Sequence, residues 1–130
     1  MIDREQYMPG PASSRTFDNT PFRTAVSPQT AATMRQAMIG VVQGGTGTAA
    51  QISGVEVGGK TGTAELDDTG SKSEAWFSCF AGPPGAPPQV VVTVLVENQP
   101  GANEGTGGRV AAPIAKQLVQ QALAIQNGGG

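Results

Sequence analysis

The hydrophobic pattern along the chain first becomes regular after Ser27, where apolar side chains recur at the spacing of helical turns. This spacing is typical of an amphipathic α-helix. Ser27 can cap the start of the helix, Pro28 suits its first position and Gly44 can end it. We expect one apolar stripe of this helix to fill the core, a role that methionine often takes. The stripe consists of Met34, Ala37, Met38 and Val41.

Three stretches rich in branched, aromatic or small alternating residues follow the helix. Turns rich in Asp, Gly and Pro separate them, at residues 67–73 and 83–88. Connections as short as these predict antiparallel pairing of the strands. The third stretch is apolar almost throughout, which indicates cover on both of its faces. The predicted strands span residues 55–66, 74–82 and 89–97.

A second amphipathic helix is predicted at residues 109–125, where Pro113 must lie in the first turn or bend the helix. The order of helix, three antiparallel strands and helix defines an α+β fold. If both helices cover one face, the other face of the apolar sheet is bare and requires more protein than this chain offers. The apolar side of this helix consists of Ala111, Ile114, Leu118, Ala122 and Ile125.

The remaining segments carry weaker patterns. Residues 1–22 are polar and broken by prolines, so we expect a loop or a disordered lead-in there, and residues 44–54 form a connector rich in Gly and Thr. Residues 127–130 are expected to be a flexible tail. The folded part therefore spans residues 23–126, which is one small domain or a portion of a larger one.

Composition removes several classes of function. The net charge is −2 with no basic block, and only Trp76 and Tyr7 offer large stacking platforms beside four Phe, so nucleic-acid binding has little support. The absence of histidine removes Ser-His-Asp and Cys-His catalysis and most zinc sites, and we expect no metal and no cofactor. The single cysteine, Cys79, is expected to be buried in the core.

The stretch GVEVGGKTGTAEL fits two motifs. Read from Gly54, it matches the phosphate loop G-x-x-x-x-G-K-[ST], and the apolar stretch VVVTVLVE ends in an acid that could hold magnesium. However, Val55 and Val57 favour a strand, and Glu56 would face the phosphates with a negative charge. The helix that must open after Thr61 has no signal. A nucleotide hydrolase is therefore the least favoured interpretation.

Read from Lys60, the same stretch contains K-T-G, a motif of the serine transpeptidases that penicillin attacks. A lysine beside hydroxyl groups on a strand can supply positive charge and hydrogen bonds for a substrate carboxylate. Open backbone N–H groups on the strand can stabilise an oxyanion. Gly58, Gly59 and Gly62 would let another backbone or a ligand approach closely. We therefore interpret the stretch as a strand that lines an acyl-transfer cleft.

The wider sequence resembles the class B penicillin-binding proteins, the monofunctional D,D-transpeptidases of cell-wall elongation and division. The resemblance covers roughly residues 20–125 and is greatest to the actinobacterial penicillin-binding protein A group. It rests on the order and spacing of PFRTAVSPQTAATMRQAMIGVV, GGTGTAAQISGVEVGGKTGTAE, AWFSCFAGP, VVVTVLVEN and GTGGRVAAPIAKQLV.

The resemblance implies specific roles for the motif residues. Lys60 would assist proton transfer among the serine and lysine groups of the cleft and add positive potential. Thr61 and Thr63 would bind the terminal carboxylate of the D-Ala-D-Ala stem peptide of peptidoglycan, or of a β-lactam. The backbone N–H of Thr63 would be an oxyanion donor, with Gly62 keeping the approach clear. Two further residues, Trp76 and Arg109, are expected to have packing roles.

The family requires S-x-x-K and S-x-N as well as K-T-G, and neither occurs in this sequence. The chain is therefore expected to lack the nucleophile, to be inactive alone, and to pair with the missing N-terminal part of the transpeptidase domain, which carries the helical subdomain. The family acts at the extracytoplasmic face of the membrane, whereas this sequence has no signal segment or anchor of its own. The alternative function is a non-catalytic interaction module that binds a partner through its bare sheet face.

Overall fold

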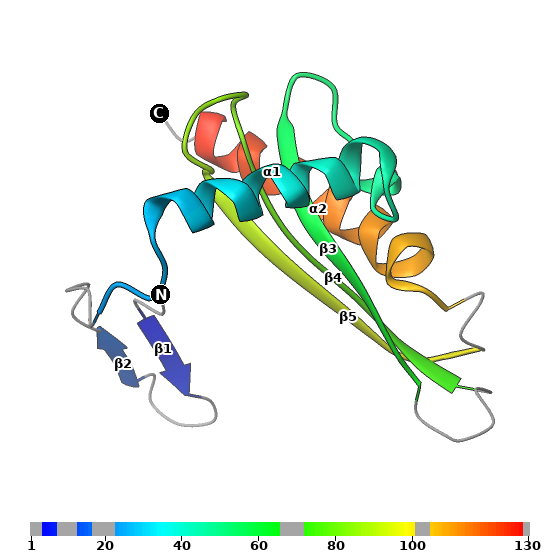
Figure 1. Cartoon of the computed structure of the whole chain (residues 1–130). Helices are drawn as coiled ribbons and strands as arrows, with labels where there is room; N and C mark the ends of the chain where they lie inside the picture. Colours follow the sequence, from blue (N-terminus) through cyan, green and yellow to red (C-terminus); the bar gives the residue numbers. More distant parts are fainter. Residues whose placement is uncertain (1–3, 8–12, 17–22, 66–71, 101–104, 129–130) are drawn as a thin grey trace.

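A computed structural model of the protein describes residues 4–7, 13–16, 23–65, 72–100 and 105–128. Its main part is a sheet of three antiparallel strands in the order β3-β4-β5. These strands are β3 (Glu56–Glu65), β4 (Lys72–Gly82) and β5 (Val90–Pro100). Two long helices accompany the sheet (Figure 1). The α+β fold and the antiparallel pairing predicted from the sequence are confirmed.

Helix α2 (Ala112–Gly128) covers β4 and β5 from one side and follows a π-helical turn, η2 (Gly107–Ala111). The first turn of α2 contains Pro113, as expected. The predicted apolar side of this helix was wrong, because Ile114, Leu118 and Ile125 are exposed. The small side chains of α2 face the sheet instead and allow the helix to approach closely. Its buried residues are Ala112, Ala115 and Val119.

Helix α1 (Pro28–Gly44) lies beside β3, at the edge of the sheet (Figure 1). Its Arg35 reaches the Phe80 side of the sheet, whereas Val42, near its end, belongs to the same core as α2. Its start is as predicted, since the Ser27 hydroxyl accepts a hydrogen bond from the Thr30 backbone N–H at 3.1 Å. The predicted methionine stripe does not fill the core, because the side chain of Met34 is 57% exposed. The helix is rotated so that Ile39 and Val42 are its buried residues.

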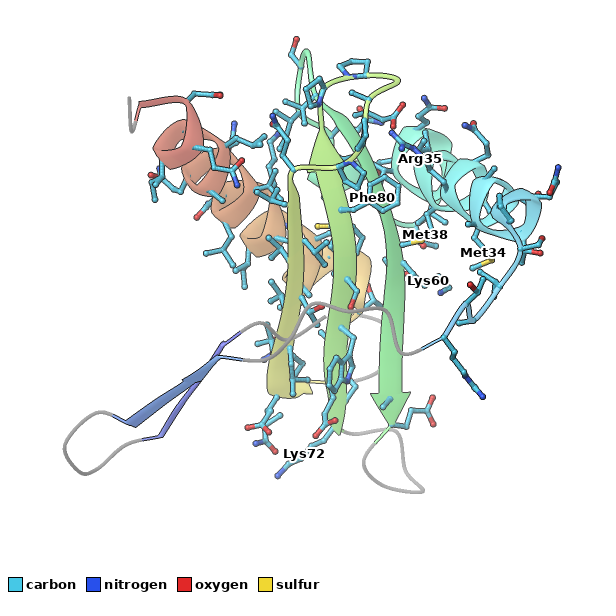
Figure 2. All side chains as sticks on the ribbon, turned by 90° about the vertical axis from the view of Figure 1, so that its left-hand side faces the viewer. Met34, Arg35, Met38, Lys60, Lys72 and Phe80 are labelled. Carbon is cyan, nitrogen blue, oxygen red and sulfur yellow. The ribbon has the colours of Figure 1, made fainter. Side chains whose placement is uncertain are left out.

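A charged contact fixes α1 to the sheet. The Arg35 guanidinium forms a salt bridge with the Glu56 carboxylate at the start of β3 and donates a hydrogen bond to the Ala86 carbonyl oxygen at 2.5 Å. It also lies over the ring of Phe80, 5.6 Å from the ring centroid. The Gly85 N–H donates to the other oxygen of Glu56 at 3.4 Å. We call this group the Arg35 clamp; it joins α1, β3, β4 and the β4–β5 turn (Figure 2).

One side of the sheet is only partly covered. Alternation along the strands places Phe77 and Cys79 in the core under α2, and Trp76 and Phe80 on the other side. On that side α1 reaches β3 and the Phe80 ring, whereas Val91 on β5 is 77% exposed. The third strand is thus covered on one face only by the described residues, which agrees with the expectation that an apolar sheet face of this chain is bare. We call the uncovered area the open face; its exposed apolar residues are Trp76, Val91 and Leu95.

The two ends of the chain differ from expectation. Two short antiparallel strands, β1 (Arg4–Tyr7) and β2 (Ser13–Thr16), occur where the sequence suggested a loop or disorder over residues 1–22. Helix α2 continues to Gly128, so the first half of the predicted tail at 127–130 is helical. The rest of the lead-in and of the tail, together with most of the predicted turn at 67–73, lies outside the described residues.

Candidate active site

The K-T-G motif lies on β3, which is an edge strand of the three-stranded sheet and has only β4 beside it. In the register of the pair, Lys60 is opposite Ser78 and Gly62 is opposite Trp76. Successive side chains of a strand point to opposite faces. Lys60 therefore lies on the side of the open face, whereas Thr61 and Thr63 lie on the side of α2.

The Lys60 side chain is exposed and projects from β3 on the side where α1 lies, below Met38 in the view of Figure 2. Its Nζ donates a hydrogen bond to the carbonyl oxygen of Thr61 at 2.5 Å. Among the described residues no carboxylate pairs with this amine. The amine is therefore positioned at the edge of the sheet with its charge uncompensated by the described part of the chain.

The two threonines of the motif face a pocket of about 590 Å³ on the opposite side of β3. The hydroxyl oxygens of Thr61 and Thr46 are 2.6 Å apart, and the Gly107 N–H donates to the Thr63 hydroxyl at 3.4 Å. We call this cavity the threonine pocket, because hydroxyl groups from three separate segments gather in it. It is lined by Thr46, Thr48, Ala49, Thr61, Thr63, Thr106, Gly107, Gly108 and Arg109.

Sequence reasoning missed most of this pocket. Thr46 and Thr48 belong to the stretch interpreted only as a connector, and Thr106 to a loop before the last helix. The repeated Gly-Thr in GGTGTAA was the available signal. Small side chains let a ligand approach the main chain, and hydroxyl groups offer it hydrogen bonds. Only folding brings these segments beside residues 60–63, because 15 residues separate Thr46 from Thr61 and 44 separate Thr63 from Gly107.

The turn η2 approaches β3 at backbone distance. A Cβ on Gly107 would lie 2.0 Å from the Trp76 carbonyl oxygen and 2.6 Å from that of Gly62. A Cβ on Gly108 would lie 2.1 Å from the Thr46 carbonyl oxygen. No side chain fits at either position without displacing the main chain. The diglycine therefore holds the K-T-G strand, the Thr46 loop and the start of the last helix in one arrangement.

The other glycines of the motif have a different use. A Cβ on Gly58 would meet the ring of Phe80 at 2.2 Å, and one on Gly59 would meet the ring of Phe77 at 2.5 Å. Gly62 accommodates Trp76, whose Cβ would lie 3.2 Å from an added Cβ. The expected close approach at these positions thus exists, but aromatic rings of β4 occupy it at Gly58 and Gly59.

The setting of the motif differs from that of a phosphate loop. Such a loop must open a helix whose backbone N–H groups meet the phosphates. Here β3 continues through Thr61 as far as Glu65, and β4 then returns antiparallel to it. The stretch is a strand, as the β-branched residues before the lysine indicated.

Cys79 is buried under α2, as expected. Burial raises the pKa of its thiol to about 11, against a smaller lowering influence of a backbone hydrogen bond at Val92. A thiol with this pKa is protonated at neutral pH and is a poor nucleophile. Cys79 is therefore a core residue.

Comparison with known proteins identifies the family. The chain matches the family model of the penicillin binding protein transpeptidase domain over residues 12–120. It therefore belongs to this family, as the sequence resemblance implied.

Curated relatives include the peptidoglycan D,D-transpeptidase PbpA of Mycobacterium tuberculosis, which is 42% identical over 103 residues. That match covers 78% of this chain and 20% of the relative. Stage V sporulation protein D of Bacillus subtilis is 38% identical over 105 residues, which are 78% of this chain and 16% of that protein. The chain thus spans about a fifth of the length of the curated relatives that it matches.

Solved structures agree. Penicillin-binding protein A from M. tuberculosis, as a ceftriaxone acyl-enzyme complex, superposes with a TM-score of 0.71 at 38% identity, covering 84% of this chain and 24% of that one. The transpeptidase domain of penicillin-binding protein 3 from Burkholderia pseudomallei gives a TM-score of 0.69 at 31% identity, covering 88% and 36%. In the part of the chain that the structure describes, no helix combines the length and the apolar character needed to cross a membrane.

Proposed function

We propose that this chain forms the K-T-G wall of a peptidoglycan D,D-transpeptidase. The observation that carries the proposal is the placement of residues 60–63 on an edge strand, with a lysine on one side and two threonines on the other. An edge strand leaves a row of backbone groups available for a substrate chain. Membership of the transpeptidase family supports the same assignment.

Each motif residue has a proposed role. The exposed amine of Lys60 assists proton transfer at the serine and lysine groups supplied by the rest of the domain. Thr61 and Thr63 bind the terminal carboxylate of the stem peptide with their hydroxyl groups. The backbone N–H of Thr63 stabilises the oxyanion of the tetrahedral intermediate, and Gly62 leaves its approach clear. The proton-transfer and oxyanion roles require groups that the N-terminal part of the domain contributes, whereas carboxylate binding does not.

The proposed reaction is acyl transfer through a serine. The serine oxygen attacks the carbonyl carbon of the D-Ala-D-Ala peptide bond, the bond breaks, and the terminal D-Ala leaves with a proton on its nitrogen. The amine of a neighbouring stem peptide then attacks the ester carbonyl, forms the cross-link and returns the serine. A β-lactam enters the first step in place of the stem peptide, and related structures are acyl-enzyme complexes with ceftriaxone, imipenem and penicillin G.

The proposed partner of this chain is the preceding part of the transpeptidase domain. The open face presents Trp76, Val91 and Leu95, and α2 presents Ile114 and Leu118, all at least 38% exposed. Apolar residues gathered on a sheet face and along one helix side mark an interface. Because peptidoglycan lies outside the cytoplasmic membrane, the proposal places the complete enzyme at the extracytoplasmic face.

The proposal is tested in a chimera in which this chain replaces the matching 103 residues of the M. tuberculosis relative. In this chimera Lys60→Ala should abolish acylation by fluorescent penicillin, because proton transfer at the nucleophile is lost. Lys72→Ala is the matched control, since Lys72 is also exposed but lies at the start of β4, away from residues 60–63. Labelling of Lys60→Ala at the rate of the parent chimera contradicts the assigned role.

A second candidate function is a non-catalytic module that uses the open face for a protein partner. The exposure of Val91, at 77%, favours an interface of some kind on β5. The two candidates differ in the chimera: a module predicts no penicillin acylation even with Lys60 intact, whereas the transpeptidase proposal predicts acylation. The isolated 130-residue chain should not be labelled covalently in either case, because no serine in it has a lysine three residues later.

A further inference from the structure

A carboxylate bound in the threonine pocket needs a positive group nearby to balance its charge. A carboxylate bound by Thr61 and Thr63 must give up part of its hydration shell, and neutral hydroxyl groups alone compensate weakly for a negative charge. Lys60 lies on the other side of β3, with its amine donating to the Thr61 carbonyl oxygen. The described residue that lines the pocket and carries a positive charge is Arg109.

The fold brings Arg109 to this position by the backbone. Gly107 and Gly108, directly before it, lie against Gly62 and Thr46 at distances that admit no Cβ. The Arg109 backbone N–H donates to the Thr106 carbonyl oxygen at 3.1 Å, which fixes the turn at the pocket rim. The backbone from which the Arg109 side chain extends is therefore held in place by close contact with the K-T-G strand.

The guanidinium is available for a ligand. The side chain of Arg109 is exposed, and no carboxylate within the described ranges forms an ion pair with it. By strand alternation Glu65 shares the side of Thr61 and Thr63, but it lies beyond them at the end of β3 and does not line the pocket. A free arginine among five threonines is suited to a bound anion.

We propose that Arg109 is the charged partner of the substrate's terminal carboxylate and determines specificity for it. This inference rests on the proposed function and deepens it. The guanidinium donates two parallel hydrogen bonds to the carboxylate oxygens, while Thr61 and Thr63 donate their hydroxyl protons. Lys60 then serves the nucleophile side alone. The packing role that the sequence suggested for Arg109 is replaced by ligand binding.

The proposal makes the site selective for ligands with a free carboxylate over neutral analogues of the same shape. An amide or ester cannot accept the same paired, charge-assisted bonds, so it gains little from Arg109. A lysine at the position would keep the charge but lose the paired geometry.

The test uses the same chimera and measures second-order acylation rates for benzylpenicillin and its methyl ester. Arg109→Gln should lower the rate for the free acid about ten- to hundredfold and leave the ester rate nearly unchanged. Arg109→Lys should fall between the two. Arg23→Gln, at an exposed arginine outside the pocket, is the control and should leave both rates unchanged. An acid-to-ester ratio that Arg109→Gln does not alter overturns the proposal.

This outcome is separable from failure of the proposed function. Full acylation of Lys60→Ala contradicts the catalytic assignment, whereas an unaltered acid-to-ester ratio in Arg109→Gln contradicts only the role of Arg109. A second measurement uses the 130-residue chain itself and tests the role of Arg109 even if the chimera does not fold. In amide-resolved NMR, N-acetyl-D-alanyl-D-alanine should shift Thr61, Thr63 and Gly107 with millimolar affinity, and its C-terminal amide should not. An equal response to acid and amide, or no response to either, also overturns the proposal.

Discussion

At the start of β3, a charged side chain holds the strand: the Arg35 clamp joins Glu56 to α1, to the Ala86 carbonyl and to the Phe80 ring. Near its other end, around Thr63, backbone-to-backbone contact with η2 and weak hydroxyl hydrogen bonds hold the strand instead. Ten residues of one strand are thus fixed by two different kinds of interaction.

The difference indicates which end is free to bind. At the clamp, every charge already has a protein partner, so little is left for a ligand. At the threonine end, rigidity comes from glycine contacts that use no side chains, and the hydroxyl groups of Thr61 and Thr63 stay at a cavity. A site fixed by its main chain can offer its side chains to substrate, which is the preorganised arrangement that binding favours.

The largest expected effect comes from Gly107→Ala at the threonine end. The new methyl group would meet the Trp76 and Gly62 carbonyl oxygens at 2.0 and 2.6 Å. Overpacking against backbone should lower the free energy of unfolding by about 3 kcal/mol or more. Urea denaturation of the chain measures it. Gly40→Ala is the control: an added Cβ there meets nothing within 4 Å, and the change should stabilise α1 by about 0.5–1 kcal/mol. Equal behaviour of the two variants contradicts the backbone contact.

A smaller effect is expected from Arg35→Met at the clamp. The substitution keeps the apolar stem but removes the salt bridge and the hydrogen bond to Ala86. The side chains of Arg35 and Glu56 remain 29% and 20% exposed, so water partly replaces the lost contacts. We expect the melting temperature to fall by a few degrees, clearly less than for Gly107→Ala. Thermal unfolding followed by circular dichroism measures the melting temperatures of both variants. A larger fall for Arg35→Met than for Gly107→Ala would mean that the clamp stabilises the fold more than the glycine contact does.

The clamp also predicts a pH dependence that the threonine end lacks. The hydrogen bond from Arg35 holds the pKa of the Glu56 carboxyl below its ordinary value, helped by Gly85 and opposed by partial burial. Because the folded pKa is depressed, the stabilisation is complete above the ordinary pKa and is lost as pH falls through the folded value. The stability difference between wild type and Glu56→Gln should therefore be largest near pH 7 and shrink in acid. A difference that stays constant down to strongly acidic pH contradicts the clamp.

The smallest stability effect should come from Thr46→Val. It removes the 2.6 Å hydroxyl contact with Thr61 but keeps the shape of the side chain. The expected loss in the free energy of unfolding is about 0.5–1 kcal/mol, since water reaches the exposed hydroxyl groups. Chemical denaturation measures it against wild type. A loss as large as that of Gly107→Ala would mean that hydroxyl groups, rather than the glycine contact, hold this end.

Local signals in the sequence were sufficient to predict the two long helices and the three-stranded sheet, but not β1 and β2. Ser27 and Pro28 marked the start of α1. The short turns between strands indicated the antiparallel sheet, in which Lys60 on β3 lies opposite Ser78 on β4. The α+β class and the family followed from these elements together with the motif order. Each of these inferences depends on residues that are close in sequence.

The contacts between distant segments were beyond such reasoning. The apolar periodicity of α1 and α2 predicted helices but did not identify their most buried residues, which include Ile39 on α1 and Ala115 on α2. The Arg35–Glu56 pair spans 21 residues, and nothing local marks it. The threonine pocket likewise combines three segments, so Arg109 could only be assigned to packing before the fold placed it beside Thr61.

The Arg35 clamp holds the stretch from Glu56 to Thr63 at its start, and the Gly107 contact holds it at its end. The number of residues between these two contacts is therefore fixed. Removing or adding one residue between these two contacts would turn every later side chain to the opposite face. Lys60 would then lie on the side of α2, and Thr61 on the side of the open face. We therefore expect this segment to tolerate substitutions but not changes of length. Single-residue insertions and deletions in homologous chains should occur in the flanking turns and be absent from these eight positions.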